Sequence, residues 1–324
     1  MDSRGWAEVA AAPPASFGEP LQELATARDG AIACPLARYA VLDIRGEDAR
    51  EFLQGQLTCD VAKVGPTAAR FGGHCTPQGR LLATLLLVGQ ADGYRMLLAA
   101  DLADAIAARL RKYVLRARVR IEREAAVQAI GIGGPQSAAA IGRAVGTAPM
   151  RDMEAVLYAS ALFVRLPGDL FVVLAPAADL PALWALLSRE ARPCGTAAWE
   201  WLQVRAGIPW ITMATQDQFV PQMTGLDALG GVSFDKGCYP GQEIVARTHY
   251  LGEVKRRLRR GHSPAPAQAG DLLLAQGQNR AVVLNAAPAP QGGHDLLAVV
   301  QDSAGDRLSL RSADGPSVAL SAAA

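Results

Sequence analysis

The sequence lacks the features that would indicate a disulfide-stapled, zinc-binding or membrane protein. Its five cysteines are odd in number and widely spaced, and no two of them form a C-x-x-C pair. A disulfide framework and a zinc ribbon are therefore not expected, no metal site is predicted, and a reducing compartment is favoured. No run of about 18 uncharged apolar residues occurs, so no membrane-spanning helix is predicted. These absences favour a soluble, cytoplasmic protein without a membrane partner.

The chain also lacks a charge imbalance and a signal peptide. Its formal net charge is +1 over 324 residues, which argues against a protein that coats nucleic acid but leaves room for a local basic patch. Residues 1–28 are rich in Ala and Pro and contain no apolar core of signal-peptide length. They are expected to form a disordered leader. Half of the chain is apolar, which is enough for two or three domains.

Hydrophobic periodicity predicts two similar units followed by a third of another kind. A strand, a helix, a hairpin and a second helix follow one another in the first unit, and the same order returns in the second. Each unit is predicted as an α+β lobe of split β-α-β character, over residues 29–125 and 126–250. Short alternating strands separated by Gly, Pro, Asn and Asp then predict a small C-terminal β-barrel over residues 251–324. The strands are expected at 271–275, 280–287, 294–301, 306–311 and 316–320.

The segment FDKGCYPGQE, residues 234–243, concentrates polar chemistry in a largely apolar chain. Glycines near Cys238 permit a tight backbone path that presents the thiol, and Lys236 two residues earlier favours the thiolate. Taken alone, an isolated cysteine is more often an inert core residue, and Gln242 and Glu243 could simply cap the next element.

This segment resembles the K-G-C-Y-x-G-Q-E signature of the YgfZ-type folate-binding proteins, which are relatives of the glycine-cleavage T-protein. Pro240 stands where the family often has Thr. The resemblance covers about residues 36–310 and includes the stretches FLQGQLTCDV, CTPQGRLLATLLL, RAGIPWI, FVPQMTGLDALGGVSF and EIVARTHYLGEVKRRL.

The resemblance implies a three-lobed ring whose central cavity holds tetrahydrofolate or a derivative. It also implies an accessory role in the assembly or repair of iron–sulfur proteins, including enzymes that modify tRNA. By position, Tyr39 and Trp199 match the family's two folate-associated aromatic residues, and a flat pterin suits aromatic faces. Trp201 and Trp210 are expected to be packing residues.

The resemblance also implies roles for the motif itself. Gln242 and Glu243 are expected at the folate, and the motif is expected to line the cavity. Cys238 is the candidate reactive thiol, with Lys236 beside it. The sequence leaves open whether this thiol attacks a substrate, contacts a cluster or is structural.

One departure from the T-protein bears on catalysis. The T-protein carries an Asp pair in the strand that matches GRLLATLLL, where this chain has Ala83 and Thr84. Neither side chain can act as a carboxylate acid or base, so aminomethyl transfer by that mechanism is not expected. Asp43 and Asp60 are other carboxylates, but no spacing supports either. A folate-dependent one-carbon transferase is thus the alternative to the accessory protein.

A basic run follows the motif. Its five charges allow three interpretations: a solvated strand face, a dock for the polyglutamate tail of a folate, or a contact for tRNA phosphates. The last would make the chain a tRNA-binding modification factor, although no aromatic residues interleave the run. The residues are Lys255, Arg256, Arg257, Arg259 and Arg260.

Overall fold

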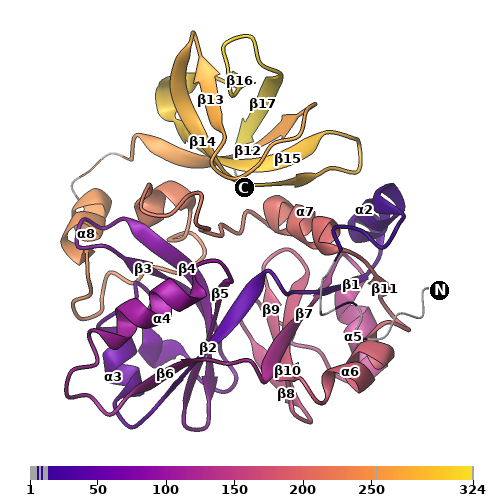
Figure 1. Cartoon of the computed structure of the whole chain (residues 1–324), viewed down its shortest axis with the longest axis vertical. Helices are drawn as coiled ribbons and strands as arrows, with labels where there is room; N and C mark the ends of the chain where they lie inside the picture. Colours follow the sequence, from indigo (N-terminus) through magenta and orange to yellow (C-terminus); the bar gives the residue numbers. More distant parts are fainter. Residues whose placement is uncertain (1–5, 7–8, 10–13, 251, 253, 323–324) are drawn as a thin grey trace.

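The computed structural model describes residues 6, 9, 14–250, 252 and 254–322. It shows two α+β lobes side by side with a β-barrel above them (Figure 1). The predicted α+β fold with a C-terminal barrel is confirmed. One hydrophobic core cluster contains Leu85 of the first lobe, Val172 of the second and Trp201 between them and the barrel. The two lobes therefore share a core.

The first lobe is built on a five-stranded antiparallel sheet with the order β3-β4-β5-β2-β6. The predicted strand, hairpin and helices are present, and β3 is an additional strand that periodicity did not predict. Helix α4 packs on β2 and β6. The elements are β2 (Tyr39–Arg45), α3 (Ala49–Gln54), η1 (Val61–Lys63), β3 (Arg70–Cys75), β4 (Leu81–Gln90), β5 (Gly93–Ala99), α4 (Ala103–Arg111) and β6 (Arg120–Arg123).

The second lobe is built on a six-stranded sheet with the order β11-β1-β7-β10-β9-β8. Strand β1 was predicted to belong to the first lobe, but it pairs with β7 and β11 of the second. All four of its residues are buried, so their backbone N–H and C=O groups need hydrogen-bond partners, which β7 and β11 supply along its two edges. The elements are β1 (Ile32–Pro35), β7 (Val127–Gly133), α5 (Ser137–Val145), β8 (Ala155–Tyr158), β9 (Ala161–Leu166), β10 (Leu170–Pro176), α6 (Leu180–Leu187), β11 (Arg192–Pro193) and α7 (Thr196–Ala206).

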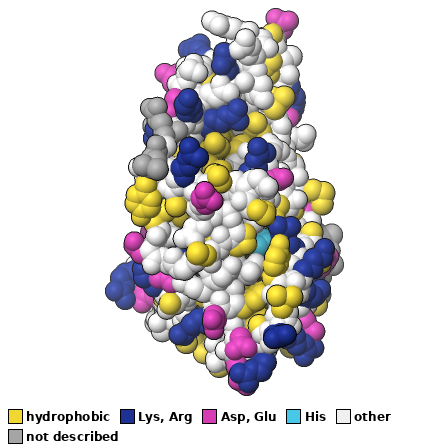
Figure 2. Space-filling view, turned by 90° about the vertical axis from the view of Figure 1, so that its left-hand side faces the viewer, with side chains coloured by type: hydrophobic (Ala, Val, Ile, Leu, Met, Phe, Trp, Pro, Cys, Tyr) yellow, Lys and Arg dark blue, Asp and Glu magenta, His cyan; other side chains and the backbone are white. Residues whose placement is uncertain are grey.

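A connecting segment with η2 (Pro221–Thr224) and α8 (Gln242–Tyr250) leads into a closed six-stranded barrel. The barrel lies above the first lobe when the molecule is viewed from the side of α8 (Figure 2). The basic run forms the first barrel strand, β12, which the predicted strand positions had not included. The elements are β12 (Arg256–Ser263), β13 (Leu272–Ala275), β14 (Gln278–Pro288), β15 (His294–Gln301), η3 (Asp302–Ala304), β16 (Arg307–Leu310) and β17 (Ser317–Ala322).

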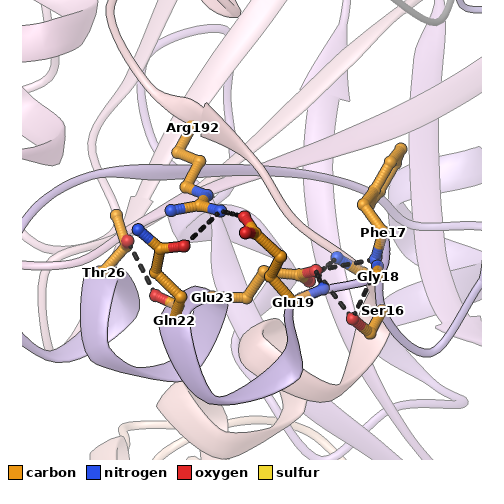
Figure 3. Close-up of polar contacts among 9 residues, drawn as sticks. Ser16, Phe17, Gly18, Glu19, Gln22, Glu23, Thr26 and Arg192 are labelled. Carbon is orange, nitrogen blue, oxygen red and sulfur yellow. Dashed lines mark hydrogen bonds and ion pairs between the residues drawn. The ribbon is translucent and has the colours of Figure 1, made fainter. Parts of the chain in front are cut away.

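The prediction of a disordered leader over residues 1–28 is wrong for the part that the structure describes; residues 1–5, 7–8 and 10–13 lie outside it. Helix α2 (Pro20–Asp29) packs against α7. The Glu23 carboxylate is 2% exposed and accepts hydrogen bonds from Ser16 Oγ and Phe17 N, both at 2.7 Å, and from Gly195 N at 2.8 Å (Figure 3). These bonds fasten the segment before α2 to the start of α7.

Trp6 adds a second attachment for the N-terminal segment. Its ring lies 5.5 Å from that of Trp184 on α6, and its indole N–H donates to Gln128 Oε1. Composition suggested disorder because Ala and Pro dominate the segment, but Trp6 and Glu23 both make tertiary contacts. Among the described residues, no helix is long and apolar enough to cross a membrane.

Candidate functional site

A cavity of about 620 Å³ lies where the two lobes meet the barrel, and we call it the central cavity. The first lobe contributes the start of β2 and the end of β5, α7 contributes one face, and the barrel contributes two segments. The lining residues are Arg38, Tyr39, Ala99, Ala100, Asp101, Glu200, Gln203, Val204, Ile208, Trp210, Thr212, Ala214, Ala267, Gln268, Ala269, Asn285 and Ala286.

The amide of Gln203 organises the aromatic side chains of the cavity. With its oxygen facing the indoles, it accepts from Trp210 Nε1 at 2.7 Å and Trp199 Nε1 at 3.2 Å, and its nitrogen donates to the Tyr39 hydroxyl at 2.6 Å. The rings of Tyr39 and Trp210 meet edge to face, with centroids 4.7 Å apart. Burial raises the pKa of the Tyr39 phenol, which therefore stays neutral.

The two aromatic residues expected at the ligand have different positions. Tyr39 lines the cavity, as the resemblance implied, but Trp199 is 1% exposed and lies behind the wall. Its ring packs on Gly131, where a Cβ would come within 2.6 Å of it. Trp210, expected to be a packing residue, lines the cavity instead. Trp201 is a packing residue, buried with its indole N–H donating to Asp295 at 2.8 Å.

Sequence analysis missed the charged groups of the cavity. Glu200 forms an ion pair with Arg38, and burial raises the pKa of its carboxyl while Arg38 opposes that shift. Asp101 Oδ2 accepts a hydrogen bond from Met213 N at 2.9 Å. Glu200 and Gln203 lie on α7 at a spacing of three residues, which places them on the same face as the cavity wall. That spacing was the available signal, but by itself it does not show that this face of the helix lines a cavity.

The positions that match the T-protein's Asp pair are buried. Ala83 is 0% exposed, and Thr84 is 2% exposed with its hydroxyl accepting from Ile211 N at 2.9 Å. Thr84 therefore fastens β4 to the chain that follows α7. Asp43 and Asp60 are occupied elsewhere, because Arg45 and Gln90 bind Asp43, and Gln54 and Ala62 bind Asp60.

The motif loop, residues 234–241, packs on the first lobe. The Lys236 ammonium donates to the carbonyls of Leu57 at 2.6 Å and Cys59 at 2.8 Å, and it lies 5.2 Å from the centre of the Tyr239 ring. Burial lowers the pKa of Lys236 to about 8. Gly241 has a φ of +83°, and a Cβ there would come within 2.5 Å of Thr76 O. This glycine lets the loop lie directly against the turn at 76–79.

The motif side chains do not reach the central cavity. Within the described parts of the chain, no residue from 231–250 is among those that line it. Cys238 is exposed, whereas the other four cysteines are buried. Gln242 donates to Lys236 O at 3.5 Å, and Glu243 is exposed in the first turn of α8, where a negative charge stabilises a helix. The expectation that this segment lines the central cavity is therefore not met.

The basic run divides into three parts. Lys255, Arg256 and Arg257 are exposed, and Arg257 lies 3.5 Å from Asp302. Arg259 pairs with Asp306 at 2.6 Å, and Arg260 lines a separate pocket. Basic side chains gather with hydrophobic ones where the barrel meets the first lobe (Figure 2). In the described residues, no group of three or more His, Cys, Asp or Glu side chains could hold a metal ion.

Comparison with known proteins gives the family. The family described as "GCVT N-terminal domain" matches residues 11–236. The tRNA-modifying protein YgfZ of Enterobacter sp. (strain 638) is 33% identical over 291 residues, which is 88% of this chain and 89% of that protein. The chain belongs to the YgfZ family. Its resemblance to that family is thereby confirmed.

Other YgfZ proteins agree with this assignment. Those of Edwardsiella ictaluri (strain 93-146) and Escherichia coli O157:H7 (strain EC4115 / EHEC) are 34% and 31% identical, and the matches cover 80% and 88% of this chain and 81% and 89% of the relatives. The crystal structure of glycine cleavage system aminomethyltransferase T from Bartonella henselae matches with a TM-score of 0.79 at 20% identity, over 95% of this chain and 90% of that one. The likeness to this aminomethyltransferase structure shows a shared fold.

Proposed function

We propose that this YgfZ-family chain binds a reduced folate in the central cavity and serves as an accessory protein in tRNA modification, through iron–sulfur enzymes. The observation that carries the proposal is the wall formed by Tyr39 and Trp210, held by one amide and bordered by Glu200. The name of the relatives, tRNA-modifying protein, supports the part of the proposal that concerns tRNA modification.

The chemistry of the wall suits a pterin. Aromatic side chains suit a flat heterocycle, and half-buried Tyr39 and Trp210, which is 4% exposed, line one side of the cavity. A pterin offers an amino group and a ring N–H, which a carboxylate such as Glu200 can accept together. Burial raises the pKa of the Glu200 carboxyl, and the ion pair with Arg38 acts against that rise. The three lobes then surround the ligand and exclude most of the water from it.

Calorimetric titration with tetrahydrofolate tests the proposal. Trp210→Ala should weaken binding by about 1–3 kcal/mol, the range of a stacked base on an aromatic side chain. Trp199→Ala should also weaken it, because the Gln203 amide loses one of its two indole donors. Tyr113→Ala, which removes an exposed aromatic of the first lobe, is the matched control and should bind like the parent. Unchanged affinity in Trp210→Ala would remove the central cavity as the folate site.

Aminomethyl transfer is the less supported candidate. The positions that correspond to the Asp pair are buried, and Thr84 already holds Ile211 N. We propose that the chain does not transfer an aminomethyl group, and that Thr84→Asp alone does not create the activity. Incubation with an aminomethylated carrier protein and tetrahydrofolate should give no methylene-tetrahydrofolate. Robust turnover by the unaltered chain would contradict this.

A direct contact with tRNA has one specific observation in its favour. The Phe234 and His249 rings stack with centroids 3.7 Å apart, and exposed Tyr250 meets both edge-on. Helix α8 and strand β12 both pack against η2, so the helix that ends with two of these rings and the strand of the basic run have a neighbouring element in common. Sequence analysis found no aromatic residues within the run, but the fold places Phe234 of the motif loop beside His249 and Tyr250 of α8.

Filter binding to tRNA at several salt concentrations tests this contact. The proposal predicts weaker binding and a shallower salt slope for Arg256→Gln, because one phosphate contact is lost. Arg311→Gln is the matched control on the barrel, since Arg311 is already paired with Asp271. Equal binding by the parent and Arg256→Gln would assign the run to a solvated strand face.

A further inference from the structure

A second pocket, of about 370 Å³, lies between the end of α7 and the barrel, and we call it the arginine pocket. Arg205 enters it from α7 and Arg260 from β12. Strands β15 and β17 complete the wall. The lining residues are Val204, Arg205, Arg260, Gly261, His262, Asp295, Leu296, Ala319, Leu320 and Ser321.

The two guanidinium groups of this pocket have no carboxylate partner among the described residues. Arg260 Nε is buried without an acceptor, and the positive charge of Arg205 adds to burial in lowering the pKa of Arg260. Arg205 lies over the Trp201 ring, 5.2 Å from its centre. On the same strand, by contrast, Arg259 pairs with Asp306. Arg205 is exposed and Arg260 is half-buried, so the cost lies in the unsatisfied Nε of Arg260 beside a like charge, and a bound anion would relieve it.

The one carboxylate in the pocket is not that partner. Asp295 Oδ2 accepts from Trp201 Nε1 at 2.8 Å. Asp295 Oδ1 lies 2.8 Å from His262 Nδ1 and accepts from Gln291 at 3.1 Å. Both of its oxygens are therefore occupied by groups other than arginine. The donors of Arg205 and Arg260 remain available to an external oxyanion.

The arginine pocket adjoins the central cavity. Val204 lines both. Ala286 of the central cavity is paired in register with Leu296 of the arginine pocket, and neighbouring strands are about 4.8 Å apart. In the central cavity, Arg38 is the sole Lys or Arg among the described lining residues, and Glu200 already pairs with it. The unpaired guanidinium groups of the adjoining pocket are thus open to an acidic tail that leaves the central cavity.

We propose that the arginine pocket binds the carboxylates of the glutamate chain of a folate whose pterin lies in the central cavity; this rests on the proposed function. Guanidinium groups bind carboxylates through paired N–H donors, and a planar fork in a partly buried pocket favours this over a point charge. The monoglutamyl form is too short to reach the two arginines, so the site distinguishes folates by the length of their glutamate chain.

Titration of the full-length protein with monoglutamyl and pentaglutamyl tetrahydrofolate tests the proposal. The parent should bind the pentaglutamyl form about tenfold or more tightly, the size of a hydrogen bond to a charged group. Arg205→Met keeps an apolar stem over Trp201 and removes the charge, so the gain should disappear while monoglutamyl affinity stays unchanged. Arg256→Met removes an exposed arginine of the same strand and should keep the gain. The melting temperature of Arg205→Met should not fall, because one of two like charges is gone.

The outcomes distinguish a failure of this proposal from a failure of the proposed folate site on which it rests. If the monoglutamyl form binds but the longer chain adds nothing, or if Arg205→Met keeps the gain, the glutamate site is overturned and the folate site stands. If neither form binds, both are overturned. If inorganic phosphate alone binds the parent but not Arg205→Met, and chain length has no effect, the pocket binds a phosphate and the glutamate assignment is overturned.

Discussion

Gln203 shows how one side chain can fix a binding wall. Its amide joins two indoles and a phenol, and none of the three rings can shift without breaking a buried hydrogen bond. The family motifs identified Tyr39, and glycines near Cys238 suggested a presented thiol, which agrees with its exposure. They did not identify Gln203, Glu200 or Trp210, because which face of a Trp-rich helix lines a cavity depends on the packing of distant elements.

The chemical role of Cys238 remains a prediction and can be tested in one variant. Cys238 should be alkylated first, since it is exposed and the other cysteines are buried. Cys238→Ser should melt close to the parent and fail to support iron–sulfur enzymes in cells. Mass-spectrometric labelling rates, a thermal melt and complementation measure these.

The control for Cys238 is Cys75→Ser, which places a hydroxyl at a fully buried position. It should lower stability by about 1–3 kcal/mol and keep function in proportion to folded protein. If Cys238 labels no faster than Cys75, and Cys238→Ser complements fully, the thiol has no chemical role.

His74 predicts an acid-sensitive first lobe. Its Nδ1 lies 3.0 Å from Gln56 O and must donate to it, which leaves buried Nε2 without a partner. Burial, with Arg109 adding to it, lowers the pKa of His74 to about 4. In the unfolded chain this imidazole binds a proton as the pH falls through about 6.5, whereas in the folded chain it stays neutral until about pH 4. The free energy of unfolding should therefore decrease by roughly 3 kcal/mol as the pH is lowered from 6.5 to 4.

Urea denaturation at pH 7.5 and pH 4.5 checks this. His74→Asn keeps a donor toward Gln56 O but cannot be protonated, so the stability of this variant should depend less on pH. At pH 7.5 the variant should be less stable than the parent. The same dependence in both proteins would show that other groups cause it.

At the level of elements, the sequence predicted those features that depend on neighbouring residues alone, such as turns. The β9–β10 hairpin turns at Pro167–Asp169, as the P-G-D sequence indicated, with Gly168 and Asp169 at positive φ. Strand β3 was missed because Gly72 and Gly73 interrupt its propensity. Those glycines are needed for packing, since Cβ atoms there would come within 2.8 Å of Cys59 Sγ and 2.5 Å of Leu81 Cδ2. Strand β12 was absent from the predicted barrel strands, although a solvated strand face was one interpretation of the basic run.

The attachment of α2 depends on the Glu23 carboxylate. Both of its oxygens accept hydrogen bonds, so Glu23→Gln would turn an NH₂ group toward N–H and O–H donors. This should lower the free energy of unfolding by about 1–3 kcal/mol and speed proteolysis before Pro20. Glu51→Gln, at an exposed position of α3, is the control. Equal stability and equal cleavage of the two variants would show that α2 is held by its apolar contacts alone.

At the level of the whole molecule, the motif loop and the central cavity occupy different places. The loop is held to the first lobe by Lys236 on the Leu57 and Cys59 carbonyls and by Gly241 on the turn at 76–79. These contacts join segments more than a hundred residues apart in sequence, so no pattern in the motif itself could show which wall the loop would cover. The three-lobed arrangement followed from family resemblance, because element order alone does not place lobes around a cavity.

The position of the cavity predicts where a folate should stabilise the molecule. The first lobe, α7 and the barrel all contribute to its walls, so a bound ligand should strengthen the contacts among these three parts. At a free concentration 100 times the dissociation constant, tetrahydrofolate should raise the free energy of unfolding by about 2.7 kcal/mol. Hydrogen exchange should slow at residues 99–101, along α7 and at 267–269 together. Trp210→Ala at the same concentration should show a smaller rise. If protection instead appears at 234–241 and α8 alone, the folate lies beside Cys238, and the cavity between the lobes and the barrel has another ligand.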